Sequence, residues 1–147
     1  MRFEDRPPEP LASVPGFLLS WHGQRIAARF ASVLEPLGLR PQHFGVMTLI
    51  DAHPGSAQRE LVTRSLIDPS SMVSVIDELE GMGLAERRRH PDDRRKHAVY
   101  LTARGRRTLQ RARGAAGKMA QEVFAPLEPR ELETLRRLLR KLAGVEA

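Results

Sequence analysis

The stretch from Asp68 to Leu101 constrains the fold most, because a well-capped helix is followed there at once by a basic hairpin. Asp68 is a favourable N-cap residue, and Pro69 fits the first position of a helix. After them, apolar residues recur at intervals of three, four and seven positions: Met72, Val75, Ile76 and Leu79. This spacing predicts an amphipathic helix with one narrow buried face that ends near Gly83.

Two short segments, 85–89 and 97–101, predict antiparallel strands with a turn around Pro91-Asp92-Asp93. The hairpin carries six strong cations, which are Arg87, Arg88, Arg89, Arg94, Arg95 and Lys96. Free aspartates would oppose binding to an anion. Asp93 lies two residues before Arg95, so we expect its carboxylate to orient that guanidinium through a charge-assisted hydrogen bond. An arginine that is oriented in advance loses less freedom on binding.

Helical periodicity accounts for most of the remaining chain. It predicts helices over about 14–37, from Pro41 to about 52, from a cap at Ser56 to about Leu66, from a cap at Thr102, and from about Pro129. Residues 1–14, rich in proline and charge, are expected to form a flexible arm, and residues 15–147 a single domain. The order of elements predicts a mainly α fold: a winged helix-turn-helix over about 41–101, with a small antiparallel β-hairpin as the wing.

Charge and the absence of cysteine narrow the function. The 147 residues include 24 Lys and Arg against 18 Asp and Glu, and the formal net charge of +6 favours an anionic partner such as nucleic acid or a membrane surface. The lack of Cys excludes disulfides and thiolate metal sites. The histidines show no strong metal-ligand spacing, so we expect no metal and no cofactor, with a zinc-sensing form as the alternative. No apolar run has transmembrane or signal-peptide length, which favours a cytoplasmic protein without membrane contact.

The capped helix and the hairpin are together suited to double-stranded DNA. The second helix of a helix-turn-helix enters the major groove with its N-terminal residues toward the base edges. Those residues here are Ser70, Ser71, Val73 and Ser74. A wing arginine can enter a narrow, A·T-rich minor groove, while the other wing cations (Arg87, Arg88, Arg89, Arg94 and Lys96) contact phosphates. The alternative is an ordinary solvated helix beside a solvated charged hairpin.

These residues resemble the winged-helix core of the MarR (multiple antibiotic resistance regulator) family. The matching segments are Leu79-Glu80-Gly81-Met82-Gly83-Leu84, Asp93-Arg94-Arg95 at the wing tip, Leu101-Thr102-Ala103-Arg104-Gly105, and LGLRPQHFGVM at 37–47. The resemblance extends over about residues 15–143. It implies a homodimer in which helices at about 15–37 and 103–143 form the interface and Arg95 is the wing arginine. Two-fold symmetry then predicts a palindromic operator with half-sites about one helical turn apart.

The resemblance also implies a ligand, because many members of the family bind small aromatic or phenolic anions between the dimer helices and the DNA-binding lobe and then release DNA. The residues that we expect to line such a crevice are Trp21, His22, Arg25, His43 and Met47. The alternative is that Trp21 and Met47 belong to the core and that His22 lies at the dimer interface.

Four positions depart from the family pattern. His43 stands in place of the usual Gln and Arg40 in place of the usual Thr cap, so the second helix is expected to begin differently. Ser74 and Glu78 occupy positions of the recognition helix where basic residues are common. More of the DNA affinity is therefore left to the wing.

Catalysis has little support in the sequence. We find no glycine-rich phosphate loop, no nucleophile elbow and no carboxylate pair placed for acid–base chemistry, so the chain is not expected to be an enzyme. The favoured interpretation is a sequence-specific transcriptional regulator, a homodimeric repressor released by a small aromatic ligand. Two alternatives stay open: an architectural or weakly specific DNA-binding protein without an effector, and an interaction module whose basic wing meets an acidic protein.

Overall fold

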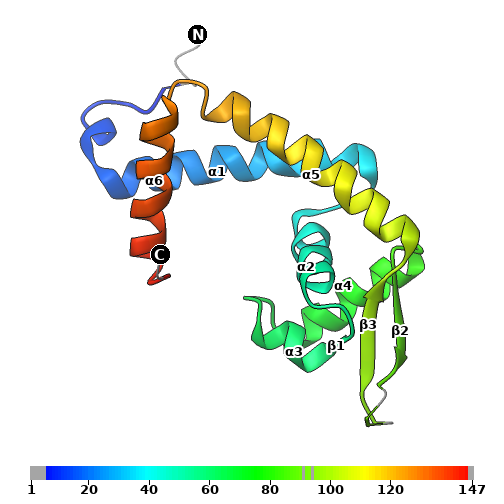
Figure 1. Cartoon of the computed structure of the whole chain (residues 1–147). Coiled ribbons are helices and arrows are strands. Elements are labelled where there is room, and N and C mark those ends of the chain that lie inside the picture. The colour runs from blue at the N-terminus through cyan, green and yellow to red at the C-terminus, as the bar shows by residue number, and fades with distance from the viewer. Residues whose placement is uncertain (1–5, 91, 94, 146–147) are drawn as a thin grey trace.

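The structure is a computed structural model, and it describes residues 6–90, 92, 93 and 95–145. Among the predicted DNA contacts, Arg94 lies outside these residues. Two long helices, α1 (Pro15–Leu34) and α5 (Ala103–Val123), lie side by side and form one arm (Figure 1). A lobe of short helices with a hairpin lies at one end of this arm, and α6 (Pro129–Leu142) lies at the other end (Figure 1).

The lobe is a winged helix-turn-helix, as the sequence predicts. Its elements are η3 (Glu35–Leu37), α2 (Pro41–Ala52), β1 (Ser56–Ala57), α3 (Gln58–Thr63), α4 (Pro69–Gly81), β2 (Ala85–Arg89) and β3 (His97–Leu101). The strands form an antiparallel sheet in the order β1-β3-β2, and Arg88 pairs with Ala98 in the hairpin register. Within the segment expected to be a flexible arm, the described residues include a 3-10 helix, η2 (Leu11–Ser13). No helix in the described part of the chain combines the length and apolar character needed to cross a membrane.

The predicted cap at Ser56 is wrong. Ser56 and Ala57 instead pair with Val99 and Ala98 as a third, two-residue strand, and Ala57 takes the N-cap position of α3. The Ser56 hydroxyl donates a hydrogen bond to the carbonyl oxygen of His53 at 2.7 Å. This side chain therefore closes the turn after α2 and is not available to the helix that follows.

The start of α4 agrees with the prediction from Asp68. Its Oδ1 accepts hydrogen bonds from the Ser71 backbone N–H at 2.9 Å and from Ser70 Oγ at 2.8 Å. Its Oδ2 accepts one from Ser71 Oγ at 2.6 Å. These bonds favour the ionised form, with the Ser71 hydroxyl as the largest cause, and hold the pKa of Asp68 well below its usual range. A carboxylate that accepts three hydrogen bonds fixes the first turn of the helix.

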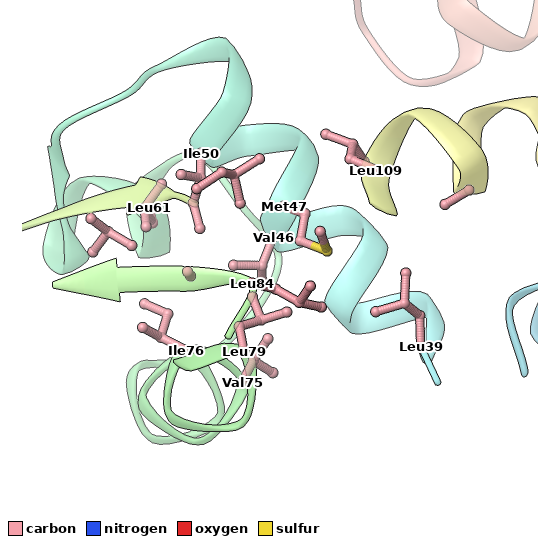
Figure 2. Packing of buried hydrophobic residues seen from close by; sticks show 14 of the residues in the cluster. Leu39, Val46, Met47, Ile50, Leu61, Val75, Ile76, Leu79, Leu84 and Leu109 are labelled. Carbon is pink, nitrogen blue, oxygen red and sulfur yellow. The ribbon is translucent and has the colours of Figure 1, made fainter. Parts of the chain in front are cut away.

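A single apolar core holds the lobe together. The predicted stripe of α4 (Met72, Val75, Ile76 and Leu79) is buried against residues of α2, α3 and the strands (Figure 2). Leu109 of α5 is also fully buried, which joins the lobe to the long arm (Figure 2). Burying a side chain of this size contributes about 1.5–3 kcal/mol, so this contact between lobe and arm is a substantial one.

The turn between α4 and β2 contacts the first turn of α5 closely. Gly83 has a φ of +71°, which favours glycine, and its carbonyl accepts a hydrogen bond from Thr102 Oγ1 at 2.7 Å. The same hydroxyl oxygen caps α5 by accepting the Gly105 N–H at 2.9 Å. A Cβ atom on Gly105 would lie 1.9 Å from the carbonyl oxygen of Leu84. The turn between α4 and β2 therefore lies so close to α5 that no side chain fits at position 105.

Gly105→Ala should destabilise the protein because its Cβ would meet the backbone of Leu84. Overpacking of this kind lowers the free energy of unfolding by about 2 kcal/mol or more. Gly45→Ala is the matched control: Gly45 lies inside α2 with open space around it, so alanine should raise the free energy of unfolding by about 0.5–1 kcal/mol. Urea unfolding at one fixed protein concentration measures both, and equal stability of the two variants would refute the close contact.

Asp68→Ala should lower the urea midpoint at neutral pH by removing the cap of α4. Because the pKa of Asp68 is lowered in the folded state, the ionised cap stabilises fully above the unfolded-state pKa of about 4. The stabilisation declines as the pH falls below that value. The gap between wild type and Asp68→Ala should therefore be constant from pH 6 to 8 and shrink from pH 4 toward pH 2. A gap of the same size at pH 3 and pH 7 would contradict the role of the ionised carboxylate.

Candidate nucleic-acid interface

The N-terminal half of α4 presents the residues that the sequence assigns to base contact. Ser70, Val73 and Ser74 are exposed, and Ser71 is half-buried. The hydroxyl protons of Ser70 and Ser71 are donated to Asp68, and that of Ser74 to the carbonyl oxygen of Ser70 at 3.3 Å. Each hydroxyl oxygen thus retains free lone pairs on a solvated helix face. The exposed face of α4 is therefore suited to accept hydrogen bonds from donor groups of a bound molecule.

The wing carries exposed cations on β2 and at its tip, but not on β3. Arg89, Arg95 and Lys96 are exposed, and the Arg88 side chain is 61% exposed. Arg88 forms an ion pair with Glu86, and its guanidinium lies 4.7 Å from the centre of the Tyr100 ring. The ring holds the guanidinium near the hairpin by a cation–π contact. The hairpin itself extends away from α1 and α5 (Figure 1).

Asp93 orients the wing tip through the backbone rather than through the guanidinium that the sequence suggested. Asp93 Oδ1 accepts a hydrogen bond from the backbone N–H of Arg95 at 2.9 Å. The carbonyl oxygen of Asp93 accepts the Lys96 N–H at 3.1 Å, and that of Lys96 accepts the His90 N–H at 2.9 Å. An aspartate two residues upstream reaches this amide easily and so forms a turn. Asp93 therefore fixes the direction of the backbone that carries Arg95.

Arg87 does not have the position expected of a phosphate contact. Its guanidinium forms ion pairs with Glu80 and, at 2.7 Å, with Asp77 Oδ1, and it donates a hydrogen bond to Gln58 Oε1 at 3.1 Å. Only 18% of its side chain is exposed. Arg87 faces inward because the acidic second half of α4 lies beside β2. It ties the wing to α4 and α3, and we correct its assignment accordingly.

A second polar cluster joins the start of α2 to α4. His43 Nδ1 accepts the Arg40 backbone N–H at 2.9 Å, so in the neutral ring Nε2 carries the proton. His43 Nε2 lies 2.6 Å from Glu78 Oε2, and the Arg40 guanidinium pairs with the same oxygen. These contacts, that of His43 first, hold the pKa of Glu78 below its usual value. The departures at Arg40, His43 and Glu78 therefore belong to one cluster.

The five residues expected to line a ligand crevice separate into two groups. Met47 is fully buried in the core and His43 is 4% exposed with both ring nitrogens engaged, so neither is retained as a ligand contact. Trp21, His22 and Arg25 lie together on α1. The rings of Trp21 and His22 meet edge to face at 4.8 Å, and the Arg25 guanidinium lies 4.6 Å from the centre of the Trp21 ring. Among the described residues, no group of His, Asp and Glu is placed to hold a metal ion.

Two basic residues that were not predicted to contact DNA lie beside the wing and the exposed face of α4. Arg59, near the start of α3, lines a hollow of about 460 Å³ together with Arg95 and Lys96 of the wing. Arg40 lies beside the exposed face of α4. The only sequence signal for either was its place next to the start of a helix in the helix-turn-helix.

Comparison with known proteins supports a regulatory function. Residues 37–96 match the sequence profile described as the MarR family. The chain is 34% identical over 105 residues to a protein of Thauera aromatica named as the transcriptional regulatory protein for the hcr operon. The match covers 71% of this chain and 63% of that relative, so the chain spans somewhat less than two thirds of the relative's length.

Solved structures with the same fold include two of a named repressor. The transcriptional repressor CouR bound to a 23-mer DNA duplex has a TM-score of 0.84 and 32% identity, with 94% of this chain and 98% of that chain covered. CouR from Rhodococcus jostii RHA1 bound to p-coumaroyl-CoA has a TM-score of 0.80 and 30% identity, with 92% and 96% covered. The relatives are named as regulators and not as enzymes. Fold, motifs and relatives agree, and the chain belongs to the MarR family of transcriptional regulators.

Proposed function

We propose that the protein is a homodimeric repressor that binds a palindromic operator and is released by a small aromatic or phenolic ligand. The observation that carries the proposal is the combination of an exposed α4 N-terminal face with an exposed basic wing in the same lobe. A major-groove helix and a minor-groove wing need this arrangement. A regulator of this kind must reach chromosomal DNA, so the proposal includes a cytoplasmic location.

The proposed DNA contacts are those wing and helix residues that remain accessible. They are Ser70, Ser71, Val73, Ser74, Arg88, Arg89, Arg95 and Lys96. Because the serine protons are engaged within the helix, we expect these hydroxyls to accept hydrogen bonds from the amino groups of adenine or cytosine. Val73 offers methyl groups to thymine. Arg95 is the proposed minor-groove residue, and the remaining cations position the backbone.

Dimerisation is proposed from the apolar surface that one chain leaves open. Within the described chain no residue of α6 is buried. Four of its leucines are at least 38% exposed, namely Leu132, Leu138, Leu139 and Leu142. Leu19 of α1 is 48% exposed as well. A second copy that packs its own helices 15–37 and 103–143 against these residues would cover them. Two-fold symmetry of that dimer gives the palindromic operator.

The ligand proposal rests on the Trp21–His22–Arg25 cluster. An indole face and a neighbouring guanidinium can bind an aromatic ring that carries an anionic group. CouR, which has the same fold, was solved with p-coumaroyl-CoA, an aromatic thioester with phosphate groups. We therefore propose an aromatic acid or its coenzyme A thioester as the effector.

One observation favours the alternative of a weakly specific DNA-binding protein. The exposed half of α4 carries serines and a valine but no arginine that could form a bidentate contact with guanine. In that case the wing would supply nearly all of the affinity, and unrelated DNA would compete as well as any single sequence.

Arg95→Ala should weaken DNA binding without loss of fold or dimer. Loss of one arginine in the minor groove should raise the Kd by about 10-fold to 100-fold and reduce the slope of log K against log salt by about one. Fluorescence anisotropy on a duplex selected from a randomised library measures both. Arg111→Ala, an exposed arginine on α5 outside the proposed DNA contacts, is the matched control. It should bind like wild type, with size-exclusion chromatography verifying that both variants are still dimers. Equal binding by wild type and Arg95→Ala would remove Arg95 from the interface.

An aromatic effector should dissociate the complex with DNA. We expect p-coumaroyl-CoA or a related aromatic acid to lower the anisotropy of bound DNA and to quench the fluorescence of Trp21, the single tryptophan of the chain. Arg25→Ala should raise the half-release concentration about tenfold or more, because it removes the proposed partner of the anion, and should leave DNA affinity without ligand unchanged. If no compound of this class quenches Trp21 or releases DNA, the ligand proposal is wrong.

A further inference from the structure

We propose that Arg40 is an additional DNA-contacting residue and that Glu78 is its positioning residue. The inference deepens the proposed function, because it concerns binding of the same DNA by the same face. It adds a contact from the N-terminus of α2, outside the recognition helix and the wing. The ligand is a phosphate of the strand that borders the major groove in which α4 lies.

The first support is the place of Arg40. A shallow groove of about 230 Å³ runs along one side of α4 and is lined by Arg40, Gln42, Ser70, Ser74 and Glu78. Ser70 and Ser74 belong to the face proposed to reach the bases. When α4 lies in the major groove of DNA, the phosphates at the edge of that major groove come close to the residues that flank this face. Arg40 and Gln42 are thus placed for backbone contact rather than base contact.

The second support is the geometry of the Arg40 side chain. One of its terminal nitrogens pairs with Glu78 Oε2, yet 57% of the side chain is exposed. A guanidinium has five N–H donors, so a single carboxylate oxygen leaves most of them free for a phosphate. Long side chains lose about 2 kcal/mol of rotamer freedom when they are fixed. A guanidinium that Glu78 already holds loses less of this freedom when DNA binds.

The third support is the arrangement of acidic residues on α4. Asp77 and Glu80 are paired with Arg87, which is mostly buried and faces the protein. Glu78 is instead paired with Arg40, which faces solvent, and with His43, which is buried. The low pKa of Glu78 keeps it ionised at neutral pH. A carboxylate near DNA phosphates is unfavourable for binding by itself. Holding the exposed Arg40 in position would offset that unfavourable effect of Glu78.

The test depends on the sign of one mutational effect. If Glu78 acts only as a negative charge near DNA, Glu78→Ala must tighten binding. If Glu78 positions Arg40, Glu78→Ala should weaken binding about threefold despite the loss of negative charge. In the Arg40→Ala background the same substitution should tighten binding. Arg40→Ala alone should weaken binding about tenfold and reduce the salt slope by about one.

The four proteins of this double-mutant cycle are compared by anisotropy on one selected duplex over a range of salt, with circular dichroism to verify folding. Glu78→Asp covers the case in which Glu78→Ala does not fold: it keeps the negative charge but is one methylene shorter, so it should hold Arg40 less well. The positioning role predicts weaker binding than wild type, whereas a charge effect alone predicts unchanged binding. Tighter binding by Glu78→Ala in both backgrounds, or wild-type binding by Arg40→Ala, would overturn the proposal. Absence of DNA binding by the wild type would instead contradict the proposed function.

Discussion

The recognition helix is held in place by basic residues on two of its sides, and the DNA-binding surface depends on that constraint. Arg87 of β2 pairs with Asp77 and Glu80, while Arg40 at the N-cap of α2 and His43 within α2 contact Glu78. Such partly exposed ion pairs contribute only about 0–1 kcal/mol each to stability. Their value lies in geometry: they fix the rotation of α4 and its orientation to the wing, while the buried apolar stripe supplies most of the stability.

The same constraint explains how an acidic helix and a basic hairpin can share one binding face. Each carboxylate in the second half of α4 has a basic partner: Asp77 and Glu80 share the mostly buried Arg87, and Glu78 contacts the exposed Arg40. These partners reduce the negative field of the helix, and the exposed cations of the wing supply the positive field near DNA. Concentrating cations on a small hairpin is unfavourable in the free protein because like charges repel. Glu86, beside Arg88, and the acceptor role of Asp93 at the turn reduce this repulsion locally. DNA phosphates would neutralise the repulsion that remains between the wing cations. Because these contacts release counterions from DNA, binding should weaken as the salt concentration rises.

The sequence was sufficient for most of the fold and for the general location of the site. Local signals specified α4, because Asp68, Pro69 and the apolar spacing all act within one helix, and they specified the hairpin bounds. Ser56 was misassigned because its strand partner, Val99, lies far along the chain. Arg87 was misassigned as a phosphate contact for a similar reason. The sequence shows that it is one of the hairpin cations, whereas its pairing with Asp77 and Glu80 arises only when β2 packs against α4. His43 and Met47 show the same limit, since only the tertiary structure separates a core residue from a pocket residue.

The central claim is that this wing and this helix read a defined, two-fold symmetric DNA sequence. The most direct measurement is selection of bound duplexes from a randomised DNA library by the full-length protein, followed by sequencing. The account predicts enrichment of a palindrome whose half-sites lie about one helical turn apart. Binding without enrichment of any sequence would contradict it and would identify a protein that recognises the DNA backbone alone.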